Sequence, residues 1–458
     1  MLCSPDFNEA AERDTGNSAD APRIHLLGTG NVGKLIAHSL RGIPNPPLIT
    51  LLLHRILLIR DWRAGPREIR LVTGDQTEIQ TGFDWEPAIP RRRRHGQEVD
   101  HDRLFEDRIR TIETLEEKEK RVSEEDQDII RQQVDSSEPI KHLIVTVKAN
   151  NTVSALSSIA HRLTPDSSIL FLQNGMGIID EVNRDIFPDP STRPNFMQGI
   201  ISHGVRNSGA SLWEAVHSGF GSIQLGLLPR YSSTTTFDWK DDYPETSKYL
   251  LKTLLRTPVL AAVPLSPTEL LQAQLEKLAI NAVINPLTSL LDARNGLILY
   301  NFYLTRVLRL LIAEISLVLR SLPELQHLPN LNTRFSPERL ETLTLGVAAK
   351  TSENISSMLA DVRRGRETEI EYINGYVVRR GEELGIKCVM NYLVQNLVRG
   401  KAMGVSQETR NFIPLLLRNG MRETGEGIEA SEMSEDSDAK DRQAQQHGDI
   451  LDEEPKRV

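Results

Sequence analysis

The sequence predicts two folded domains, an α/β domain with a mainly parallel sheet followed by an all-helical domain. Between Arg23 and about residue 230, short apolar strands alternate with helical patterns, as in a sheet covered by helices. After Pro267 the apolar residues recur with the helical period. We therefore place the domain boundary between about residues 230 and 265, and expect helices at Thr268–Asn285, Phe302–Leu322, Pro337–Met358 and Glu367–Leu384.

The composition is typical of a soluble globular protein. With 458 residues, 39% of them hydrophobic and 26% charged, the chain is long enough for two or three domains. The net charge of −9 gives no support for nucleic-acid binding. No apolar run reaches membrane-spanning length, and two cysteines, Cys3 and Cys388, favour a reducing compartment over a disulfide framework. The acidic N-terminus resembles no signal peptide or mitochondrial presequence. We expect a cytoplasmic protein, with mitochondrial residence as the alternative.

The chain divides into five segments. Residues 1–22 are expected to be a disordered lead, and residues 419–458 a disordered acidic tail. Residues 23–230 form the α/β domain, 231–265 a linker and connecting strand, and 266–418 the helical domain. A charged insertion at about 87–138, opening with Arg91–Arg94, interrupts the α/β domain. It is either a docking or localisation element or a solvated insertion, and its composition favours the second.

The α/β domain begins with a glycine motif between a strand and a helix. The strand Ile24–Leu27 runs directly into Gly28-Thr29-Gly30-Asn31-Val32-Gly33, and a helical pattern follows. In this context the glycines permit a tight turn, close approach of a pyrophosphate and close packing of the helix. The phosphates would rest on the amides of the helix N-terminus. We predict a Rossmann-type dinucleotide-binding domain with these six residues at the cofactor; the alternative is a purely structural turn.

The end of the second predicted strand, Leu48–Leu53, indicates which nucleotide binds. An NAD site usually carries Asp or Glu there, to accept a hydrogen bond from the ribose 2′-hydroxyl. This chain has His54-Arg55 instead, and Arg55 can pair with a 2′-phosphate. The sequence therefore favours NADPH over NADH, although an arginine at a strand end can also be a simple surface charge.

Two further strand ends carry polar residues. The strand Lys141–Val147 is followed by Lys148, and the strand Ile169–Leu172 by Gln173-Asn174-Gly175-Met176-Gly177. Ligands of open parallel sheets bind beyond the carboxyl ends of the strands, so Lys148 and Asn174 are expected to reach the cofactor crevice. The alternatives are a surface lysine and a turn asparagine. Further strands are expected at Gly199–Val205 and Ser222–Leu227, and a β-hairpin at Ile69–Val72 and Glu78–Thr81.

The first long helix of the second domain carries a polar face. Lys277, Asn281 and Asn285 recur every four residues within an otherwise apolar stretch, so they stack along one side of the helix. A cationic donor beside two carboxamides suits a small anionic ligand with a carbonyl group. Pro286 cannot donate to the carbonyl of Ala282, so we expect the helix to kink or stop there. The alternative is an exposed polar stripe.

Four more polar residues of the second domain are candidates. Asn295 precedes Gly296, which is expected to form a turn. Asn354 and Ser357 are three residues apart and are therefore expected to be neighbours on one helical turn. Glu369 is expected at the start of an amphipathic helix. Asn354 could instead be a helix N-cap, and Glu369 a first-turn acid favoured by the helix dipole.

These motifs in combination resemble the ketopantoate reductases (2-dehydropantoate 2-reductases). The resemblance covers roughly residues 23–227 without the insertion, and 266–386. It rests on the glycine motif, Val147-Lys148 and Asn174-Gly175-Met176-Gly177, and on three motifs of the helical domain. Those three are Lys277-x3-Asn281-x3-Asn285-Pro286, Ser357-Met358-Leu359 and Thr368-Glu369-Ile370. Asn150-Asn151 stands where many members carry an aromatic residue, and Ala360 where glutamine is common.

The resemblance implies a fold, a reaction and residue roles. The fold would be a Rossmann domain followed by a helical domain like the C-terminal domain of 6-phosphogluconate dehydrogenase. Lys277 would be the proton donor; Asn281, Asn285, Asn295, Asn354 and Ser357 would bind substrate; Lys148, Asn174 and Glu369 would serve chiefly the cofactor. The reaction would be NADPH-dependent reduction of 2-dehydropantoate to (R)-pantoate, a step of pantothenate and coenzyme A biosynthesis.

Two rival hypotheses stay open. One is a reductase of the same family that acts on a different 2-oxo acid, and the other is a non-catalytic NADPH-binding sensor or scaffold that holds a partner through the charged insertion. If the protein is a reductase of 2-dehydropantoate or of another 2-oxo acid, we expect a small 2-oxo acid as its partner molecule. We expect no nucleic acid, no membrane and no metal ion, and a possible homodimer.

Overall fold

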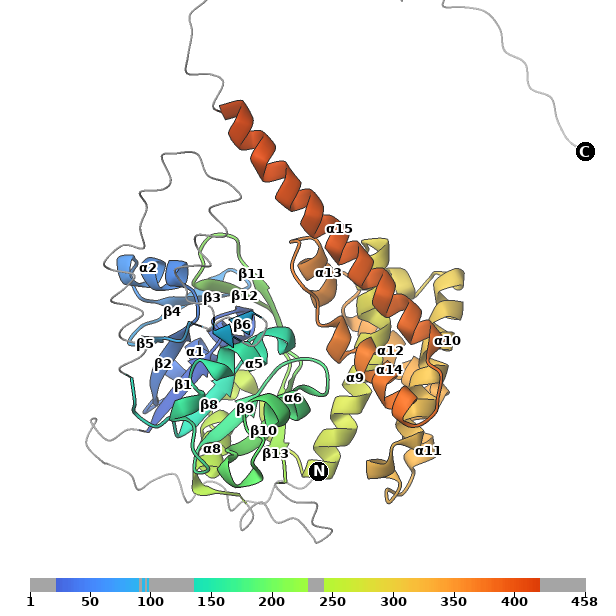
Figure 1. The fold of residues 1–458 in the computed structure, drawn as a ribbon, viewed down its shortest axis with the longest axis horizontal. Coiled ribbons are helices and arrows are strands. Elements are labelled where there is room, and N and C mark those ends of the chain that lie inside the picture. Colours follow the sequence, from blue (N-terminus) through green and yellow to red (C-terminus); the bar gives the residue numbers. More distant parts are fainter. Residues whose placement is uncertain (1–21, 90–92, 95–96, 99–135, 230–242, 421–458) are drawn as a thin grey trace, which may run out of the picture. The chain divides into compact units, whose positions relative to one another are not determined.

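A computed structural model describes residues 22–89, 93–94, 97–98, 136–229 and 243–420 of the chain (Figure 1). Of these described residues, those up to Ser406 belong to one compact unit, and those from Gln407 to Gly420 to a second. The fold and the site described below lie in the first unit. The predicted disordered lead and acidic tail, and most of the charged insertion, fall outside the described residues.

The core of the α/β region is an eight-stranded sheet with the order β14-β13-β10-β9-β8-β1-β2-β5. Neighbouring strands run parallel except for β10 and β13, which are antiparallel. Its central strands are buried on both faces, as the continuous apolar runs predict. The strands are β1 (Arg23–Leu27), β2 (Leu48–Leu53), β5 (Asp84–Pro87), β8 (His142–Val145), β9 (Ser168–Phe171), β10 (Asn195–Ile201), β13 (Ile223–Leu227) and β14 (Ala262–Pro264).

A second, four-stranded sheet with the order β11-β12-β3-β4 lies beside the first. The predicted hairpin is confirmed, because β3 (Ile69–Thr73) and β4 (Gln76–Gln80) pair antiparallel. The predicted strand Gly199–Val205 is in fact the end of β10 and the start of β11 (Gly204–Asn207), which pairs with β12 (Glu214–Gly219). Neither β5 nor β12 was predicted. A short pair, β6 (Arg93–Arg94) and β7 (Gln97–Glu98), is described within the charged insertion.

Helices cover the large sheet on both faces and close two apolar cores. The segment predicted as a linker and connecting strand contains the helix α8 as well as β14. The sequence did not predict this helix, because its apolar residues form only a short run. Leu250, Leu251 and Leu254 of that run are buried against the sheet. The helices are α1 (Asn31–Arg41), α2 (Ile56–Ala64), α5 (Ala149–Ser157), α6 (Ile178–Asp185) and α8 (Glu245–Leu255).

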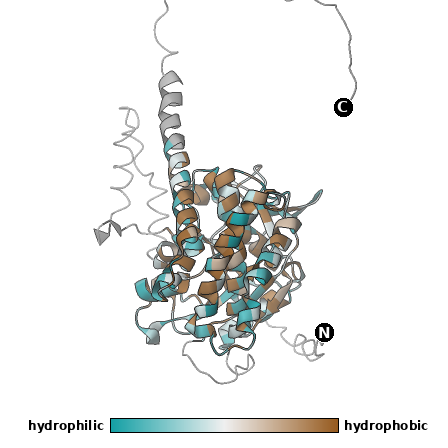
Figure 2. Cartoon of the chain, turned by 90° about the vertical axis from the view of Figure 1, so that its right-hand side faces the viewer, coloured by the Kyte–Doolittle hydropathy of each residue, from teal (hydrophilic) through white to brown (hydrophobic). Residues whose placement is uncertain are grey.

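The second part of the unit is helical around a separate apolar core, so the predicted fold class, a Rossmann-type α/β domain followed by an all-α domain, is confirmed. The long helix α15 was not predicted. The helices are α9 (Pro267–Leu291), α10 (Phe302–Ser321), α11 (Leu331–Arg334), α12 (Pro337–Lys350), α13 (Ser357–Val362), α14 (Asn374–Glu383) and α15 (Val389–Gly420). The helices mix hydrophilic and hydrophobic turns (Figure 2), and none among the described residues is both long and apolar enough to span a membrane.

Helix α9 carries the predicted polar face and is longer than predicted. It begins with a capping box in which Ser266 and Glu269 satisfy each other's free amides, followed by Pro267 in the first turn. Of the two predicted outcomes at Pro286, a kink or a stop, the stop is wrong, since α9 continues to Leu291. The carbonyl of Ala282, which Pro286 leaves without its helical donor, accepts a hydrogen bond of 2.8 Å from the Asn374 side chain. A donor from α14 thus replaces the missing backbone bond.

The predicted helix Pro337–Met358 is broken into α12 and α13. Asn354 lies in the connecting loop, and Ser356, not Asn354, caps α13 by accepting from the amide of Leu359. Asn354 and Ser357 are therefore not neighbours on one helical turn. The loop is fixed by distant partners, because the amides of Asn295 and Gly296 donate to the carbonyls of Asn354 and Ser352.

Candidate active site

The glycine motif forms the tight turn that the sequence predicts. Gly28 has a φ of +112°, and a Cβ there would lie 2.7 Å from the amide nitrogen of Val147. A Cβ on Gly33 would overlap the carbonyl oxygen of Gly28. Thr146 fixes the same carbonyl with a hydrogen bond of 2.6 Å from its hydroxyl. Both glycines are therefore required by close packing between β1, α1 and the end of β8.

The N-terminus of α1 has the properties of a phosphate site. Gly30, its N-cap, would place a Cβ in open space, with no atom within 4 Å. The first turn, which opens with Asn31 and Val32, has no acidic residue and no side-chain cap, so its amides are available to an anion. Thr29 is partly exposed beside them. The residues present fit the pyrophosphate of a dinucleotide.

Arg55 stands where the second strand ends. It is exposed and forms the N-cap of α2, immediately after β2 and His54. β2 lies next to β1 in the sheet. Arg55 therefore follows the strand that neighbours the one leading into the glycine loop. Burial, with the nearby charge of Arg55, lowers the pKa of His54 to about 4, so His54 is neutral and Arg55 supplies the positive charge at this strand end.

The loop after β9 joins the sheet to the helical part of the unit. Gly175 has a φ of +86° and packs against Tyr372, whose carbonyl accepts a hydrogen bond of 2.8 Å from the amide of Met176. Asn174 donates to the carboxylate of Glu369 at 3.3 Å, and the amide of Ala149 donates to the same carboxylate at 3.1 Å. Glu369 is buried, which raises its pKa, while these two bonds favour the charged form. Glu369 therefore links the ends of β8 and β9.

Lys148 forms an ion pair with Asp361 of α13. Burial raises the pKa of Asp361, and the charge and hydrogen bond of Lys148 oppose this rise. Lys148 itself is partly exposed and is the N-cap of α5. Asp361 was not singled out from the sequence, because its partner lies more than 200 residues away and no local pattern marks it.

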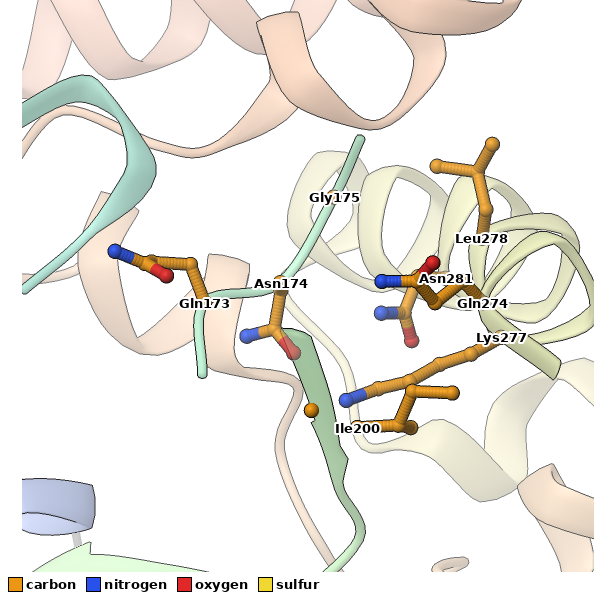
Figure 3. A pocket seen from close by; sticks show the side chains of 9 residues that line it. Gln173, Asn174, Gly175, Ile200, Gln274, Lys277, Leu278 and Asn281 are labelled. Carbon is orange, nitrogen blue, oxygen red and sulfur yellow. The ribbon is translucent and has the colours of Figure 1, made fainter. Parts of the chain in front are cut away.

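A small cleft lies between the loop after β9 and helix α9. Asn174 reaches into it from one side, and Gln274, Lys277 and Asn281 from the other, so their polar ends point toward one another (Figure 3). Apolar contact comes from Ile200 and Leu278. The cleft thus brings together three of the predicted residues: Asn174, Lys277 and Asn281.

Lys277 is the only lysine that lines this cleft. Its ammonium donates a hydrogen bond of 2.8 Å to the carbonyl of Ile201, at the end of β10. Burial lowers its pKa to about 8, and the negative charge of Glu369 opposes part of this effect. An amine with a pKa near neutrality can both give up and regain a proton, which is the property of a general acid.

Three glutamines at the cleft were not predicted. Gln173 donates to the hydroxyl of Thr152 at 3.0 Å, and Gln274 donates to the side-chain oxygen of Gln198 at 3.0 Å. Gln173 and Gln274 line the cleft. Gln274 could have been found, since it lies three residues before Lys277 and therefore on the same face of the helix.

The other predicted substrate residues lie farther along α9 and beside it, outside the lining of this cleft. Asn285 is buried on α9, two turns beyond Lys277. Asn295 is buried and donates to the hydroxyl of Thr351 at 2.9 Å, so it also holds the loop before α13. Asn354 and Ser357 are exposed on that loop and at the start of α13. Their predicted contact with substrate stays a prediction.

Two family models match the chain. One is described as ketopantoate reductase PanE/ApbA and matches residues 24–230. The other is described as the C-terminal part of ketopantoate reductase PanE/ApbA and matches residues 269–402. The two matches agree with the fold described above, because the first covers the α/β region and the second extends from α9 into α15.

Relatives and a solved structure show similarity over most of the chain. A probable 2-dehydropantoate 2-reductase from Schizosaccharomyces pombe is 28% identical over 390 residues, covering 82% of this chain and 96% of the relative. A ketoisovalerate reductase from Beauveria bassiana is 24% identical over 431 residues, covering 83% and 85%. A D-mandelate dehydrogenase solved with NADH has a TM-score of 0.60 at 16% identity, covering 84% of this chain and 99% of that chain; this likeness is one of fold.

Proposed function

Since the chain belongs to the ketopantoate reductase PanE/ApbA family, we propose that it reduces 2-dehydropantoate to (R)-pantoate with NADPH. At the level of the family it is a nicotinamide-dependent reductase of 2-oxo acids. The observation that carries the proposal is the position of Lys277, an ammonium with a pKa lowered to about 8 that faces Asn174 and Asn281 across a small cleft.

Lys277 is the proton donor in this proposal. A bound nicotinamide cofactor supplies the hydride to the carbonyl carbon of the substrate. The ammonium of Lys277 stabilises the negative charge that develops on the carbonyl oxygen and delivers a proton to it. Because its pKa is about 8, the amine is reprotonated readily from water near neutral pH before the next turnover.

Uncharged donors would orient the substrate around Lys277. Asn281, one turn away on α9, can donate to the carboxylate or carbonyl of a 2-oxo acid without adding charge. We also propose that Asn285, Asn295, Asn354 and Ser357, which lie outside the lining of the cleft, contribute to binding the carboxylate end of the substrate. The methyl-bearing carbon would contact Ile200 and Leu278.

The cofactor would be held by the end of the sheet. The amides of residues Gly28 to Gly33 would bind the pyrophosphate, and Arg55 the 2′-phosphate of NADPH. Lys148, Asn174 and Glu369 would serve the nicotinamide half. The NADH of the mandelate dehydrogenase defines the alternative, and Arg55→Ala distinguishes the two. A variant that loses about 10- to 100-fold in kcat/KM with NADPH, the value of one or two charged hydrogen bonds, while keeping its value with NADH supports NADPH; equal losses contradict it.

A panel of 2-oxo acids tests the reaction. Purified protein is mixed with NADPH and 2-dehydropantoate, ketoisovalerate, pyruvate or phenylglyoxylate, and the loss of NADPH absorbance is followed. We expect the highest kcat/KM with 2-dehydropantoate. The ketoisovalerate reductase among the relatives motivates the second candidate, in which ketoisovalerate is preferred. NADPH binding without turnover of any oxo acid would instead support the non-catalytic scaffold. Cytoplasmic residence and a homodimer stay predictions, to be checked by fractionation and by the molar mass in solution.

A further inference from the structure

A pair of hydrogen-bonded glutamines lies at the cleft. Gln274, on the first half of α9, lines the cleft, and its side-chain nitrogen donates to the oxygen of Gln198 on β10 at 3.0 Å. Gln198 is buried, with 9% of its surface exposed. The pair connects α9 to the sheet beside Lys277, which is itself bonded to the carbonyl of Ile201 at the end of the same strand.

The hydrogen bond to Gln198 orients the carboxamide of Gln274. With its nitrogen engaged by Gln198, the side-chain oxygen of Gln274 is left as an acceptor, and among the described residues no hydrogen bond occupies it. A carboxamide oxygen accepts from a hydroxyl and repels a carboxylate. The oxygen of Gln274 is therefore suited to accept from a hydroxyl group of the ligand.

The position of Gln274 along α9 matches a particular part of the substrate. Gln274 precedes Lys277 by three residues, about 4.5 Å along the helix axis at ~1.5 Å per residue. Asn281 and Asn285 follow Lys277 and lie on the opposite side of it along α9. With the keto oxygen at Lys277 and the carboxylate toward Asn281, the remaining carbon chain extends toward Gln274. Ile200 and Leu278, which line the cleft, would supply the apolar contacts of that chain.

We propose that Gln274 determines substrate specificity by accepting a hydrogen bond from a hydroxyl group on the carbon chain of the 2-oxo acid, and that Gln198 is the positioning residue that orients it. This inference rests on the proposed function and names the feature of the substrate that the cleft selects. 2-Dehydropantoate and ketoisovalerate form a matched pair, because the first carries a hydroxymethyl group that the second lacks. A site that binds a substrate hydroxyl rejects the analogue without it strongly, since its own polar group is then left unpaired.

The test is the ratio of kcat/KM for 2-dehydropantoate to kcat/KM for ketoisovalerate in the full-length protein. Gln274→Met keeps the length of the side chain and removes the acceptor. We expect this variant to lower the ratio by about 10- to 100-fold, less than the full discrimination of a hydroxyl-binding site, with kcat/KM for ketoisovalerate unchanged or raised. Gln198→Met, which leaves Gln274 intact but unoriented, should lower the ratio by a smaller factor.

Gln272→Met is the matched control, since Gln272 is on the same helix but does not line the cleft. It should leave the ratio unchanged. A ratio that stays within twofold of wild type in both Gln274→Met and Gln198→Met overturns the inference while the proposed function stands. A wild-type protein that prefers ketoisovalerate overturns the inference directly. A wild-type protein that reduces neither acid overturns the proposed function, and this inference with it.

Discussion

The two walls of the cleft are built in opposite ways. The sheet wall is the carboxyl end of the sheet, where Gly175 lines the cleft beside the side chain of Asn174. The turn of Gly28, Gly30 and Gly33 lies at the same end of the sheet, outside the cleft lining, and there the structure depends on main chain and on missing side chains. The wall formed by α9 depends on functional groups, Gln274, Lys277 and Asn281, presented along one face of a helix. The sheet wall provides room and amides, and the helical wall provides side-chain chemistry.

This difference predicts how substitutions act on each side. On the sheet wall a substitution acts through the atoms that it adds, because a Cβ meets main chain or fills the space of a ligand. On the helical wall a substitution acts through the group that it removes. Larger residues on the sheet wall should therefore weaken cofactor binding, and shorter residues on the helical wall should lower the rate of turnover.

The largest expected effect is on the helical wall. Lys277→Ala removes the proton donor, and we expect kcat for the preferred 2-oxo acid to fall by about 10²- to 10⁴-fold, while NADPH binding, measured by fluorescence titration, changes little. Lys277→Arg retains the positive charge but cannot release its proton at neutral pH, so it should recover binding of the oxo acid and little of the rate. Turnover of Lys277→Ala near the wild-type rate would remove Lys277 from the mechanism.

The sequence predicted the sheet wall more completely than the helical wall. The strand, the glycine turn and α1 are local in sequence, so the motif between Leu27 and Leu35 is sufficient to predict them. The face of α9 followed from the helical period. What failed depends on distant partners: the break between α12 and α13 has neither glycine nor proline and is held by amides of residues 295 and 296. The pairs Lys148–Asp361 and Gln198–Gln274 likewise join residues far apart in the chain.

The sheet wall is tested by two glycines that differ in their surroundings. Gly30→Ala should fold normally, because its Cβ enters open space and its φ of −68° suits alanine. The added methyl occupies space next to the helix amides, so we expect the Kd for NADPH to rise about tenfold or more, the value of one charged hydrogen bond. The cofactor-induced rise in the midpoint of thermal unfolding should shrink accordingly.

Gly33→Ala is the contrasting variant, since its Cβ would overlap the carbonyl oxygen of Gly28. It should lower the midpoint of thermal unfolding in the absence of cofactor as well as weaken NADPH binding. Gly346→Ala, at another glycine whose Cβ would meet nothing within 4 Å but in α12, should alter neither cofactor binding nor turnover. If Gly30→Ala bound NADPH as tightly as wild type, the assignment of the α1 N-terminus to the pyrophosphate would be wrong.

A smaller effect is expected on the pH dependence of kcat, because the charge of Glu369 influences Lys277 on the helical wall. The donor form of Lys277 is the ammonium, so kcat should be high below pH 8 and fall as the pH rises through about 8, the pKa of Lys277. The negative charge of Glu369 raises that pKa. Glu369→Gln removes the charge, so the pKa falls further and the decline in kcat should begin at a lower pH. Glu371→Gln, a neighbour that hydrogen-bonds Gln395, should leave the profile in place; an unshifted profile in Glu369→Gln would separate Glu369 from Lys277.

The smallest effect on turnover is expected for Asn374, whose side chain compensates for Pro286 within α9. The side chain of Asn374 donates to the carbonyl of Ala282 because Pro286 has no amide hydrogen to offer it. Asn374→Ala leaves that buried carbonyl unpaired, and we expect the free energy of unfolding to fall by about 1–3 kcal/mol, measured in denaturant, with kcat reduced only as far as Asn281 and Asn285 shift. Pro286→Ala restores a backbone donor, so the double variant should regain part of the stability lost in Asn374→Ala. An equal loss with and without Pro286 would mean that Asn374 stabilises α14 and α15 through its bond to Asn391 and not the helical wall of the cleft.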